Sequence, residues 1–368
     1  MKMLGFERTF TFPFSGDIPS YTTAYLQSTS KLQRGLKFFK RYLYMVLKGQ
    51  VSLEVHRISS KHKNLLWINM SAPSLGDSLM DLSSRTLLKG RRVDLFTDKK
   101  NAHIYKEDAF FSSVMSDESM LANINYDLVV IDSYSTRSIC VKSKWQSKKE
   151  FIGMYGFYNG PEVNRVLFSF HRMNFLLGGL MSENEINSVA MPAITVSRSD
   201  KNIVGGSNLP ERYIAIAIGG EWEYRTYSYW ERVIQMLFED DGELNIVLIG
   251  SDNGVVDAKK LMARFSTGQV FDAVSKFTFN QTAQIIRKAQ VLLCCDGGLM
   301  HAANAVDTPV VALFARLTAE MQLTKASSAH YLYDPESVRN IKPEDVFKQY
   351  SRGLERIDNK LSMQSSLE

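Results

Sequence analysis

Two stretches of the chain alternate short apolar runs with patterns of helical period. In the first stretch, the runs that predict buried strands are 65–68, 93–96 and 128–131. In the second stretch, the corresponding runs are 214–218, 245–249, 291–294 and 310–314, with helices expected over 230–238 and 282–289. Strands that alternate with helices at this spacing predict parallel sheets with helical crossovers. We therefore expect an α/β protein with two Rossmann-like lobes around a cleft.

Changes in composition divide the chain into five expected segments. They are an N-terminal extension, 1–60; a first domain, 61–196; a polar, glycine-rich linker, 197–210; a second domain, 211–345; and a C-terminal helix or tail, 346–368. Within the first domain, residues 151–192 mix aromatic, glycine and charged residues and are expected to be less regular.

The extension contains a predicted basic amphipathic helix that begins at Lys31. Its apolar row at helical spacing is Leu32, Leu36, Phe39, Leu43 and Val46, and its basic residues on the opposite face are Arg34, Lys37, Arg41 and Lys48. No acidic residue interrupts 31–48. Two interpretations are open: a surface helix that packs on the protein by its apolar row, or a helix that lies against anionic lipid.

Composition narrows the class of protein. With 45% hydrophobic and 23% charged residues, the 368-residue chain can bury sizeable cores, which excludes disorder over most of it. No apolar run approaches the length of a membrane span, and Glu7 and Arg8 stand where a signal peptide needs apolar residues. Three cysteines, two of them adjacent, indicate a reducing compartment. The net charge of +5 suits anionic partners without requiring nucleic acid.

Several common catalytic motifs are absent from the sequence. It has no G-x-G-x-x-G after a strand, no Gly-Lys of a P-loop, no H-E-x-x-H, no C-x-x-C and no G-x-S-x-G. Without any Asp-x-Asp pair, it also lacks the usual handle for a divalent ion on a nucleotide diphosphate. The sequence therefore favours metal-free chemistry or plain binding.

The most informative stretch is 294–314, which predicts a strand, a glycine turn, a helix and a second strand. Gly297 and Gly298 allow close approach of a ligand, and the free N–H groups of the new helix form an anion site that fits a diphosphate. Asp296 either accepts a hydrogen bond from a sugar hydroxyl or caps the helix in an ordinary tight turn.

This stretch resembles the C-terminal signature of the glycosyltransferase family 9 heptosyltransferases. That signature is Asp, a small residue, Gly, two residues and His, then a small-residue helix and a Pro-led strand, as in Asp296 to His301 followed by Pro309. The Gly76-Asp77 turn and the segments 214–230 and 246–250 agree with it. The resemblance covers roughly residues 64–345, and the first sixty residues have no counterpart.

The resemblance implies a GT-B fold, two Rossmann-like parallel-sheet domains facing across a cleft. It also implies transfer of heptose from ADP-heptose to the inner core of lipopolysaccharide, with inversion and without a metal or other cofactor. Asp77 then corresponds to the general base that removes the proton of the acceptor hydroxyl. An N-cap of the following helix is the alternative role of Asp77, and one residue could serve both.

The implied donor-binding residues lie in the second domain. They are Asp296, Gly297, Gly298, Leu299 and His301, with Gly219, Arg225 and Asp252. The family's diphosphate-binding Lys and its following Trp-Pro are missing, and Arg225 is the nearest cation. A solvated surface charge is the alternative for Arg225. Asp252 follows a predicted strand and is expected to bind a ribose hydroxyl.

The expected acceptor-binding residues are Gly76, Arg137, Arg165 and Arg172. An inner-core acceptor carries carboxylates and phosphates, so cations of the first domain would orient it. Each arginine is otherwise an ordinary surface charge. We expect a cytoplasmic enzyme, peripheral at the inner face of the inner membrane, with an anionic membrane surface as a further partner. The alternatives are a GT-B transferase with another donor such as a UDP-hexose, a GT-B epimerase, and a non-catalytic nucleotide-sugar-binding scaffold.

Overall fold

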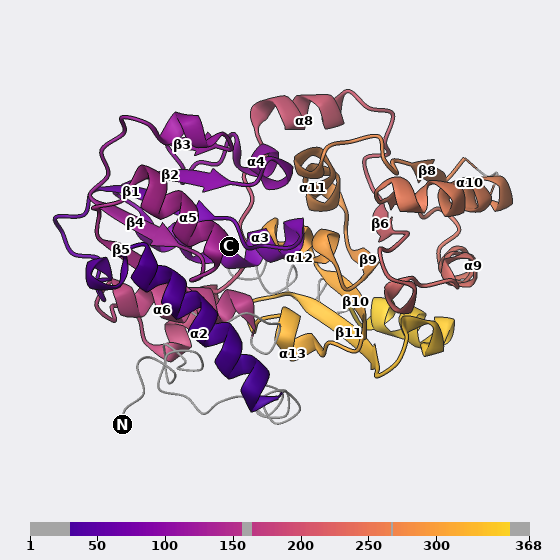
Figure 1. Cartoon of the computed structure of the whole chain (residues 1–368). Helices are drawn as coiled ribbons and strands as arrows, with labels where there is room; N and C mark the ends of the chain where they lie inside the picture. Colours follow the sequence, from indigo (N-terminus) through magenta and orange to yellow (C-terminus); the bar gives the residue numbers. More distant parts are fainter. Residues whose placement is uncertain (1–29, 157–163, 266–267, 354–368) are drawn as a thin grey trace. The chain divides into compact units, whose positions relative to one another are not determined.

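A computed structural model of the chain describes residues 30–156, 164–265 and 268–353. The chain divides into two compact units, Met1–Pro192 and Ala193–Glu368 (Figure 1). Each unit has a parallel sheet with helical crossovers and an apolar core of its own. The predicted α/β class with two parallel-sheet domains is confirmed.

The first unit contains a five-stranded parallel sheet in the order β3-β2-β1-β4-β5. Its strands are β1 (Asn64–Asn69), β2 (Arg92–Thr97), β3 (Ser113–Met115), β4 (Leu128–Ile131) and β5 (Phe151–Gly153). Its α-helices are α2 (Lys31–Leu47), α3 (Leu75–Asp81), α4 (Lys99–Tyr105), α5 (Thr136–Trp145), α6 (Arg165–Leu176) and α7 (Glu183–Val189). Short 3-10 helices are η2 (Val51–Leu53), η3 (Ser83–Leu88) and η4 (Glu118–Leu121).

The central strand β1 shows why apolar runs become strands in this chain. Five of its six residues are buried, because crossover helices cover both faces of a parallel sheet. Trp67 pairs in register with Leu95 of β2 and Val130 of β4. Continuous burial of this kind requires a continuous apolar run, which is the pattern that predicted β1, β2 and β4.

Helix α2 lies on the surface of the first unit beside α5 (Figure 1). Its predicted apolar row faces away from the core: Leu32 is 72% exposed and Phe39 is 60% exposed. The helix packs instead through Phe38, Tyr42 and the fully buried Met45. The interpretation that α2 packs by its apolar row is therefore wrong. Periodicity revealed an amphipathic helix but not which of two apolar faces would meet the core.

The second unit contains a six-stranded parallel sheet in the order β11-β10-β9-β6-β7-β8. Its strands are β6 (Ile214–Ala217), β7 (Ile246–Ile249), β8 (Val270–Asp272), β9 (Leu292–Cys295), β10 (Val310–Ala315) and β11 (Ala329–Asp334). Its α-helices are α8 (Arg198–Gly205), α9 (Trp230–Asp240), α10 (Val255–Arg264), α11 (Phe279–Lys288), α12 (Gly298–Ala305) and α13 (Ala319–Gln322). Short 3-10 helices are η5 (Glu223–Arg225), η6 (Asp252–Gly254) and η7 (Val338–Asn340).

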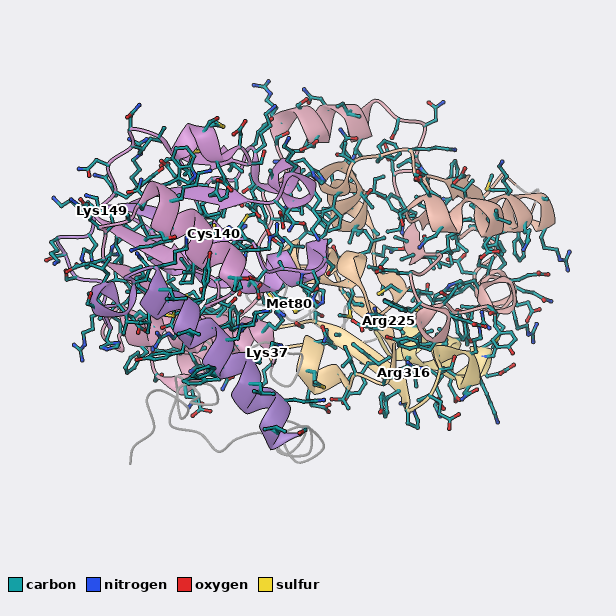
Figure 2. The ribbon with its side chains drawn as sticks, in the orientation of Figure 1. Lys37, Met80, Cys140, Lys149, Arg225 and Arg316 are labelled. Carbon is teal, nitrogen blue, oxygen red and sulfur yellow. The ribbon has the colours of Figure 1, made fainter. Side chains whose placement is uncertain are left out.

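The cysteines of the chain are free thiols. Cys140, labelled in Figure 2, is exposed on α5, whereas Cys294 and Cys295 belong to β9. Burial raises the pKa of Cys295 to about 12 and that of Cys294 well above its ordinary value. Both thiols therefore stay protonated and act as packing groups rather than as nucleophiles.

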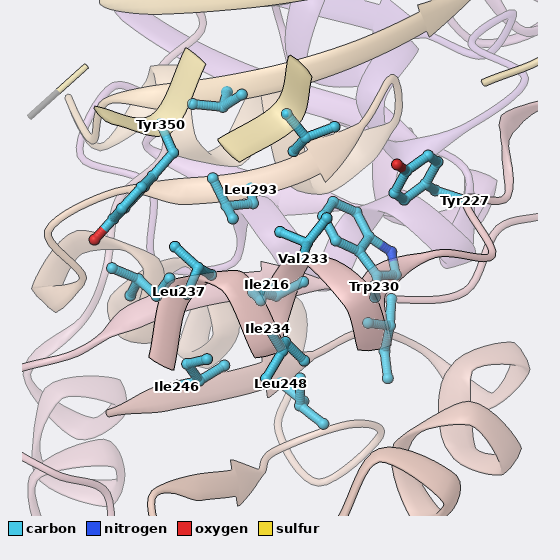
Figure 3. Close-up of a cluster of buried hydrophobic side chains, with 14 of the residues drawn as sticks. Ile216, Tyr227, Trp230, Val233, Ile234, Leu237, Ile246, Leu248, Leu293 and Tyr350 are labelled. Carbon is cyan, nitrogen blue, oxygen red and sulfur yellow. The ribbon is translucent and has the colours of Figure 1, made fainter. Parts of the chain in front are cut away.

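Helix α9 fills much of the core of the second unit (Figure 3). Trp230, Val233 and Leu237 recur at helical spacing and are buried against the sheet. The same core takes in Val346 and Tyr350, from a helix over 343–353. It therefore continues beyond residue 345, where the second domain was expected to end.

Two segments that were expected to be irregular contain helices. Within 151–192 lies α6, which buries residues on several sides, so its sequence lacks the polar face that marks an amphipathic helix. Within the expected linker 197–210 lies α8, which packs against α11. Ser197 and Asp200 form a capping box there, and their Ser-x-x-Asp spacing is the sequence signal that indicates this helix.

In each sheet, the strand order reverses between two neighbouring central strands. These strands are β1 and β4 in the first unit and β6 and β9 in the second. The crossovers that follow such a pair leave on opposite faces, so ligands bind outside the carboxyl ends of the strands at this point. The fold thus directs attention to the residues that follow these four strands.

Candidate functional site

The reversal point of the second unit carries the predicted glycine turn. Asp296 and Gly297 follow β9, and α12 begins at Gly298. Gly297 is the N-cap, and no side chain among the described residues caps the helix. The first N–H groups of a helix have no partner within it and attract anions. The alternative in which Asp296 caps the helix is wrong.

Asp296 instead forms an ion pair with Arg225. The carboxylate is almost fully buried and accepts a hydrogen bond of 3.0 Å from Nη1 of Arg225, whose side chain is 22% exposed. Arg225 ends η5, in the loop that follows β6. The pair therefore joins the loops after the two strands at the reversal point. Its geometry argues against Arg225 as a merely solvated charge.

A second arginine, which sequence reasoning missed, shares an aromatic ring with Arg225. The guanidinium of Arg316 lies 3.8 Å from the ring centre of Tyr224, and that of Arg225 lies 5.6 Å from the same centre (both arginines are labelled in Figure 2). Arg316 is exposed and directly follows β10. The rule that ligands bind beyond the carboxyl ends of strands would have found it from the predicted strand 310–314.

The hydroxyl of Thr318 lies just beyond Arg316 in the chain. It is buried, and among the described residues it has no hydrogen-bond partner. Such groups in a native fold commonly await a ligand or water. Arg225, Arg316 and the start of α12 thus offer positive charge and hydrogen-bond donors suited to a diphosphate.

Two of the three predicted donor-site glycines, Gly219 and Gly297, are glycines for different structural reasons. Gly219 has φ +82°, and a Cβ there would lie 2.6 Å from Oδ1 of Asn253, so the packing of the two loops requires it. A Cβ on Gly297 would meet nothing within 4 Å, and its φ of 166° is extended backbone. Of these two glycines, Gly297 is the one beside which open space is left for a ligand.

Three further predicted donor residues differ in exposure. His301 is buried in α12, Leu299 is half-buried there, and Asp252 is exposed at the start of η6. The Asp252 carboxylate accepts a hydrogen bond from the hydroxyl of Ser275. Asp252 is therefore accessible to a ribose, whereas His301 is better placed to pack the helix than to touch a ligand.

The predicted base, Asp77, lies in the first turn of α3. Ser74 is the N-cap: its Oγ accepts a hydrogen bond from the Asp77 N–H and donates one of 2.6 Å to the Asp77 carboxylate. The N-cap role proposed for Asp77 thus belongs to Ser74. Gly76 is buried beside it. The carboxylate, 24% exposed, keeps access to solvent while its orientation is fixed.

Arg165 joins Asp77 to a second carboxylate one helical turn further along α3. Its Nε and Nη2 donate hydrogen bonds of 2.7 and 2.6 Å to the buried Asp81, and its Nη1 lies 3.7 Å from Oδ1 of Asp77. Tyr155 stacks under the guanidinium at 5.4 Å. Arg165 comes from α6, so this arrangement depends on the packing of α6 against α3.

Burial and the ion pair act in opposite directions on these groups. Burial raises the pKa of Asp81 to about 6, although the Arg165 charge lowers it. Burial lowers the pKa of Arg165, but attraction by Asp81 and Asp77 outweighs this and raises it well above its ordinary value. Arg165 is thus a charged, positioned neighbour of Asp77 rather than a surface cation reaching for an acceptor.

The other two predicted acceptor arginines lie apart from this cluster. Arg137 is exposed at the start of α5 and pairs with Asp98 at 2.6 Å. Arg172 donates two hydrogen bonds to the carbonyl of Gly153 and stacks on Phe175. Arg172 therefore ties α6 to the end of β5, which gives it a structural role.

Asp132, after β4, organises the reversal point of the first unit. Its carboxylate accepts hydrogen bonds from the backbone N–H groups of Met70 and Ser71, at 2.7 and 2.6 Å. It also accepts hydrogen bonds of 2.6 Å from the N–H of Ser133 and from the Oγ of Ser138. Burial raises its pKa. With this many donors, Asp132 fixes the loop after β1.

The comparisons with known proteins match the part of the site in the second unit to a family. Residues 182–342 match the model of Glycosyltransferase family 9 (heptosyltransferase). These residues belong to glycosyltransferase family 9. The resemblance drawn from the sequence is confirmed, and with it the enzyme class. No curated protein sequence matches the chain.

Solved structures of related glycosyltransferases share the fold of about four fifths of this chain. A glycosyltransferase family 9 protein from Veillonella parvula DSM 2008 matches with a TM-score of 0.66 at 13% identity, over 81% of this chain and 99% of that one. The ADP-heptose lps heptosyltransferase II of E. coli matches with 0.64 at 17%, over 80% and 99%. The E. coli heptosyltransferase WaaC with ADP matches with 0.60 at 14%, over 78% and 99%. The GT-B-like fold is confirmed; at these identities the likeness shows the fold alone.

The family assignment does not test the roles of single residues. Those of Asp77, Asp296 and the other site residues stay predictions, as does independence from a metal. Among the described residues, no group of three or more His, Cys, Asp or Glu is placed to hold a metal ion.

A pH titration of stability tests the burial of Asp81. Between its ordinary pKa of 3.8 and the raised value of about 6, the unfolded carboxyl is ionised while the folded one keeps its proton. Stability is therefore lost as pH rises through this window, by up to about 3 kcal/mol. Asp81→Asn does not titrate, so its free energy of unfolding should lack this fall. Urea unfolding from pH 4 to 7 measures both curves.

Only the change of the free energy of unfolding with pH bears on the prediction. Its absolute value does not, because Asp81→Asn also removes a partner of Arg165. Asp117→Asn is the matched control: its exposed carboxylate has a pKa lowered by the backbone N–H of Ser119, so its stabilising effect is lost as pH falls. Parallel curves for the wild-type protein and Asp81→Asn would contradict the raised pKa.

Proposed function

We propose that this protein is an inverting glycosyltransferase that transfers heptose from ADP-heptose to the inner core of lipopolysaccharide. The observation that carries the proposal is the anion site at the start of α12, in residues that match family 9. Arg225 pairs with Asp296, which immediately precedes the turn that starts this helix, and Arg225 and Arg316 both lie over the ring of Tyr224. The family 9 relative WaaC has been solved with ADP and with ADP-2-deoxy-2-fluoro heptose.

The donor would bind by its diphosphate at the start of α12. Arg225 and Arg316 would neutralise the phosphates, and the hydroxyl of Thr318 would donate a hydrogen bond. Asp296, held at 3.0 Å by Arg225, would accept a hydrogen bond from a sugar hydroxyl. As the glycosidic bond to the diphosphate breaks, the leaving group gains negative charge, which these arginines stabilise. This pair of cations supports a reaction without a metal.

The acceptor would react beside α3. Asp77 would accept the proton of the acceptor hydroxyl while its oxygen attacks the anomeric carbon and the nucleoside diphosphate leaves with the bonding electrons. Single displacement on the face opposite the leaving group inverts the anomeric configuration. Ser74 and Arg165 would hold the carboxylate in the required orientation.

The proposal includes work at the cytoplasmic face of the inner membrane, because an inner-core acceptor is lipid-linked. Of the helices in the described part of the chain, none is long and apolar enough to cross a bilayer.

A second candidate keeps the fold and changes the donor to another nucleotide sugar, such as a UDP-hexose. The observation that favours it is Arg225, the nearest cation to the position where the family resemblance led us to expect a lysine. Arginine binds phosphate in a planar, bidentate manner that lysine does not share. The identity of the nucleobase in the donor is thus open to a direct test.

Calorimetric titration with ADP, UDP and GDP tests the donor site. We expect ADP to bind best, with a Kd that rises at least about tenfold in Arg225→Met and in Arg316→Met, because each loses a charge-assisted contact. Arg232→Met is the control, because Arg232 is an exposed arginine of α9 that pairs with Glu239 on the same helix. A preference for UDP would replace the donor, and equal binding by all four proteins would refute the anion site.

Gly297→Ala separates the space for a ligand from the needs of the fold. Since a Cβ there meets nothing within 4 Å, the free energy of unfolding should change by less than about 1 kcal/mol. The methyl group would enter the ligand's space, so ADP binding should weaken. Gly219→Ala is the contrasting control, because its Cβ would collide with Asn253 whether or not a ligand is bound. Unchanged ADP affinity in Gly297→Ala would place the diphosphate elsewhere.

Asp77→Asn distinguishes a transferase from a binding scaffold. Loss of the base should lower kcat at least about 100-fold, while the Kd for ADP stays unchanged, because Asp77 lies in the other unit from the nucleotide site. Asp117→Asn, an exposed carboxylate of the same unit, should retain full turnover. Turnover of Asp77→Asn at the wild-type rate would mean that another group is the base.

A further inference from the structure

Helix α2 exposes a continuous row of large apolar side chains. We define this outer row as the following residues, with exposures from 42% to 73%: Leu32, Leu36, Phe39, Leu43, Val46 and Leu47. Single exposed apolar residues are ordinary, but a contiguous row of this size on one helix marks an interaction surface.

The helix itself is firmly attached by a different face. Met45 is 2% exposed, and Phe38 and Tyr42 pack with it against the first unit's core. At the end of the helix, the buried Gln50 donates hydrogen bonds to the carbonyl groups of Lys48 and Ser147. The outer row is therefore not a core face that lost its partner. It is presented by a helix that packs on the first unit through another face.

The flank of α2 forms one wall of a basic cavity in the first unit. The cavity has a volume of about 410 Å³ and lies at the reversal point, between α2, the loop after β1 and the start of α5. Its cationic lining residues are Lys37, Lys40, Arg41, Lys100 and Arg137. Ser135 and Thr136, at the N-terminus of α5, also line it. Such a cavity suits a phosphate group.

The cavity and the outer row belong to one continuous surface. At about 100° per residue, Lys40 falls on the helix between the outer row and Arg41. No acidic residue occurs from Lys31 to Leu53, so the whole helix and the turn after it are free of negative side chains. Apolar side chains bordered by cations match the cross-section of an anionic lipid leaflet, with its apolar interior and phosphate layer.

We propose that α2 docks the protein on an anionic lipid bilayer, with the outer row among the acyl chains and a lipid phosphate in the basic cavity. Charge complementarity commits the proposal to this occupant. An apolar protein partner would cover the outer row but would bring no negative charge to a cavity lined by cations, whereas an anionic leaflet supplies both apolar chains and phosphates. The proposal deepens the proposed function by naming what holds the enzyme at the membrane.

The basic cavity lies next to the segment that carries the candidate base, so docking there would serve the reaction. Pro73 lines the cavity and immediately precedes Ser74, the residue that holds the Asp77 carboxylate. A lipid phosphate bound there would bring the membrane surface next to the candidate base. A lipid-linked acceptor would then reach Asp77 without leaving its bilayer.

Co-sedimentation of the full chain with vesicles tests the proposal without any turnover, so it can fail separately from the transferase activity. We expect binding to phosphatidylcholine vesicles that contain phosphatidylglycerol and little binding to phosphatidylcholine alone. Leu36→Asp/Phe39→Asp and Lys37→Glu/Lys40→Glu should each weaken binding at least about tenfold. Urea unfolding checks that both variants fold.

The matched control is Lys89→Glu/Lys259→Glu, which makes the same change of charge at two exposed lysines outside α2 and should bind as the wild-type protein does. Equal binding to both kinds of vesicle would overturn the role of the phosphate. Wild-type binding by Leu36→Asp/Phe39→Asp would overturn the role of the outer row. A dimer that becomes monomeric in that variant, without vesicle binding by either protein, would assign the row to a second copy of the chain.

Discussion

Burial on both faces of two parallel sheets is the constraint on which the rest of this molecule depends. Because helices cover both faces, the strands have little room for polar side chains, and the chemistry is confined to the loops at the carboxyl ends. Asp132 and Asp296 both occupy this position, directly after β4 and β9. Each carboxylate is buried, and each is satisfied by donors from a neighbouring loop. The sheets thus determine where charged groups can be held, and the loops determine which groups these are.

Patterns that follow from this constraint were readable in the sequence. Apolar runs predicted the central strands, and the Asp296 to His301 signature indicated both the glycine turn and the family. Contacts between distant segments were not readable. The pairing of Arg165 with Asp81 requires α6 to pack on α3, and a helix that is apolar on most sides gives no periodic signal for that packing. Arg316 could have been predicted from the sequence, because the rule that ligands bind beyond the carboxyl ends of strands had already selected Asp252.

The first unit uses arginine in two distinct ways, although all three predicted arginines looked alike in sequence. Arg165 and Arg172 donate hydrogen bonds within the fold, to Asp81 and to the carbonyl of Gly153 respectively. Arg137 stays exposed and borders the basic cavity. Residue type and spacing therefore identified a cationic unit, but only the packing of α6 separates the arginines that hold the structure from Arg137, which stays exposed.

The hydrogen bonds of Asp132 have a kinetic consequence for the cavity whose floor they hold. Met70 and Ser71 line that cavity, and the Asp132 carboxylate fixes both backbones before any ligand arrives. Binding there requires no loop to become ordered, so diffusion and the attraction between opposite charges would set the rate of encounter. An encounter of this kind slows steeply as ionic strength rises, whereas the apolar contacts of α2 would govern how long the protein stays.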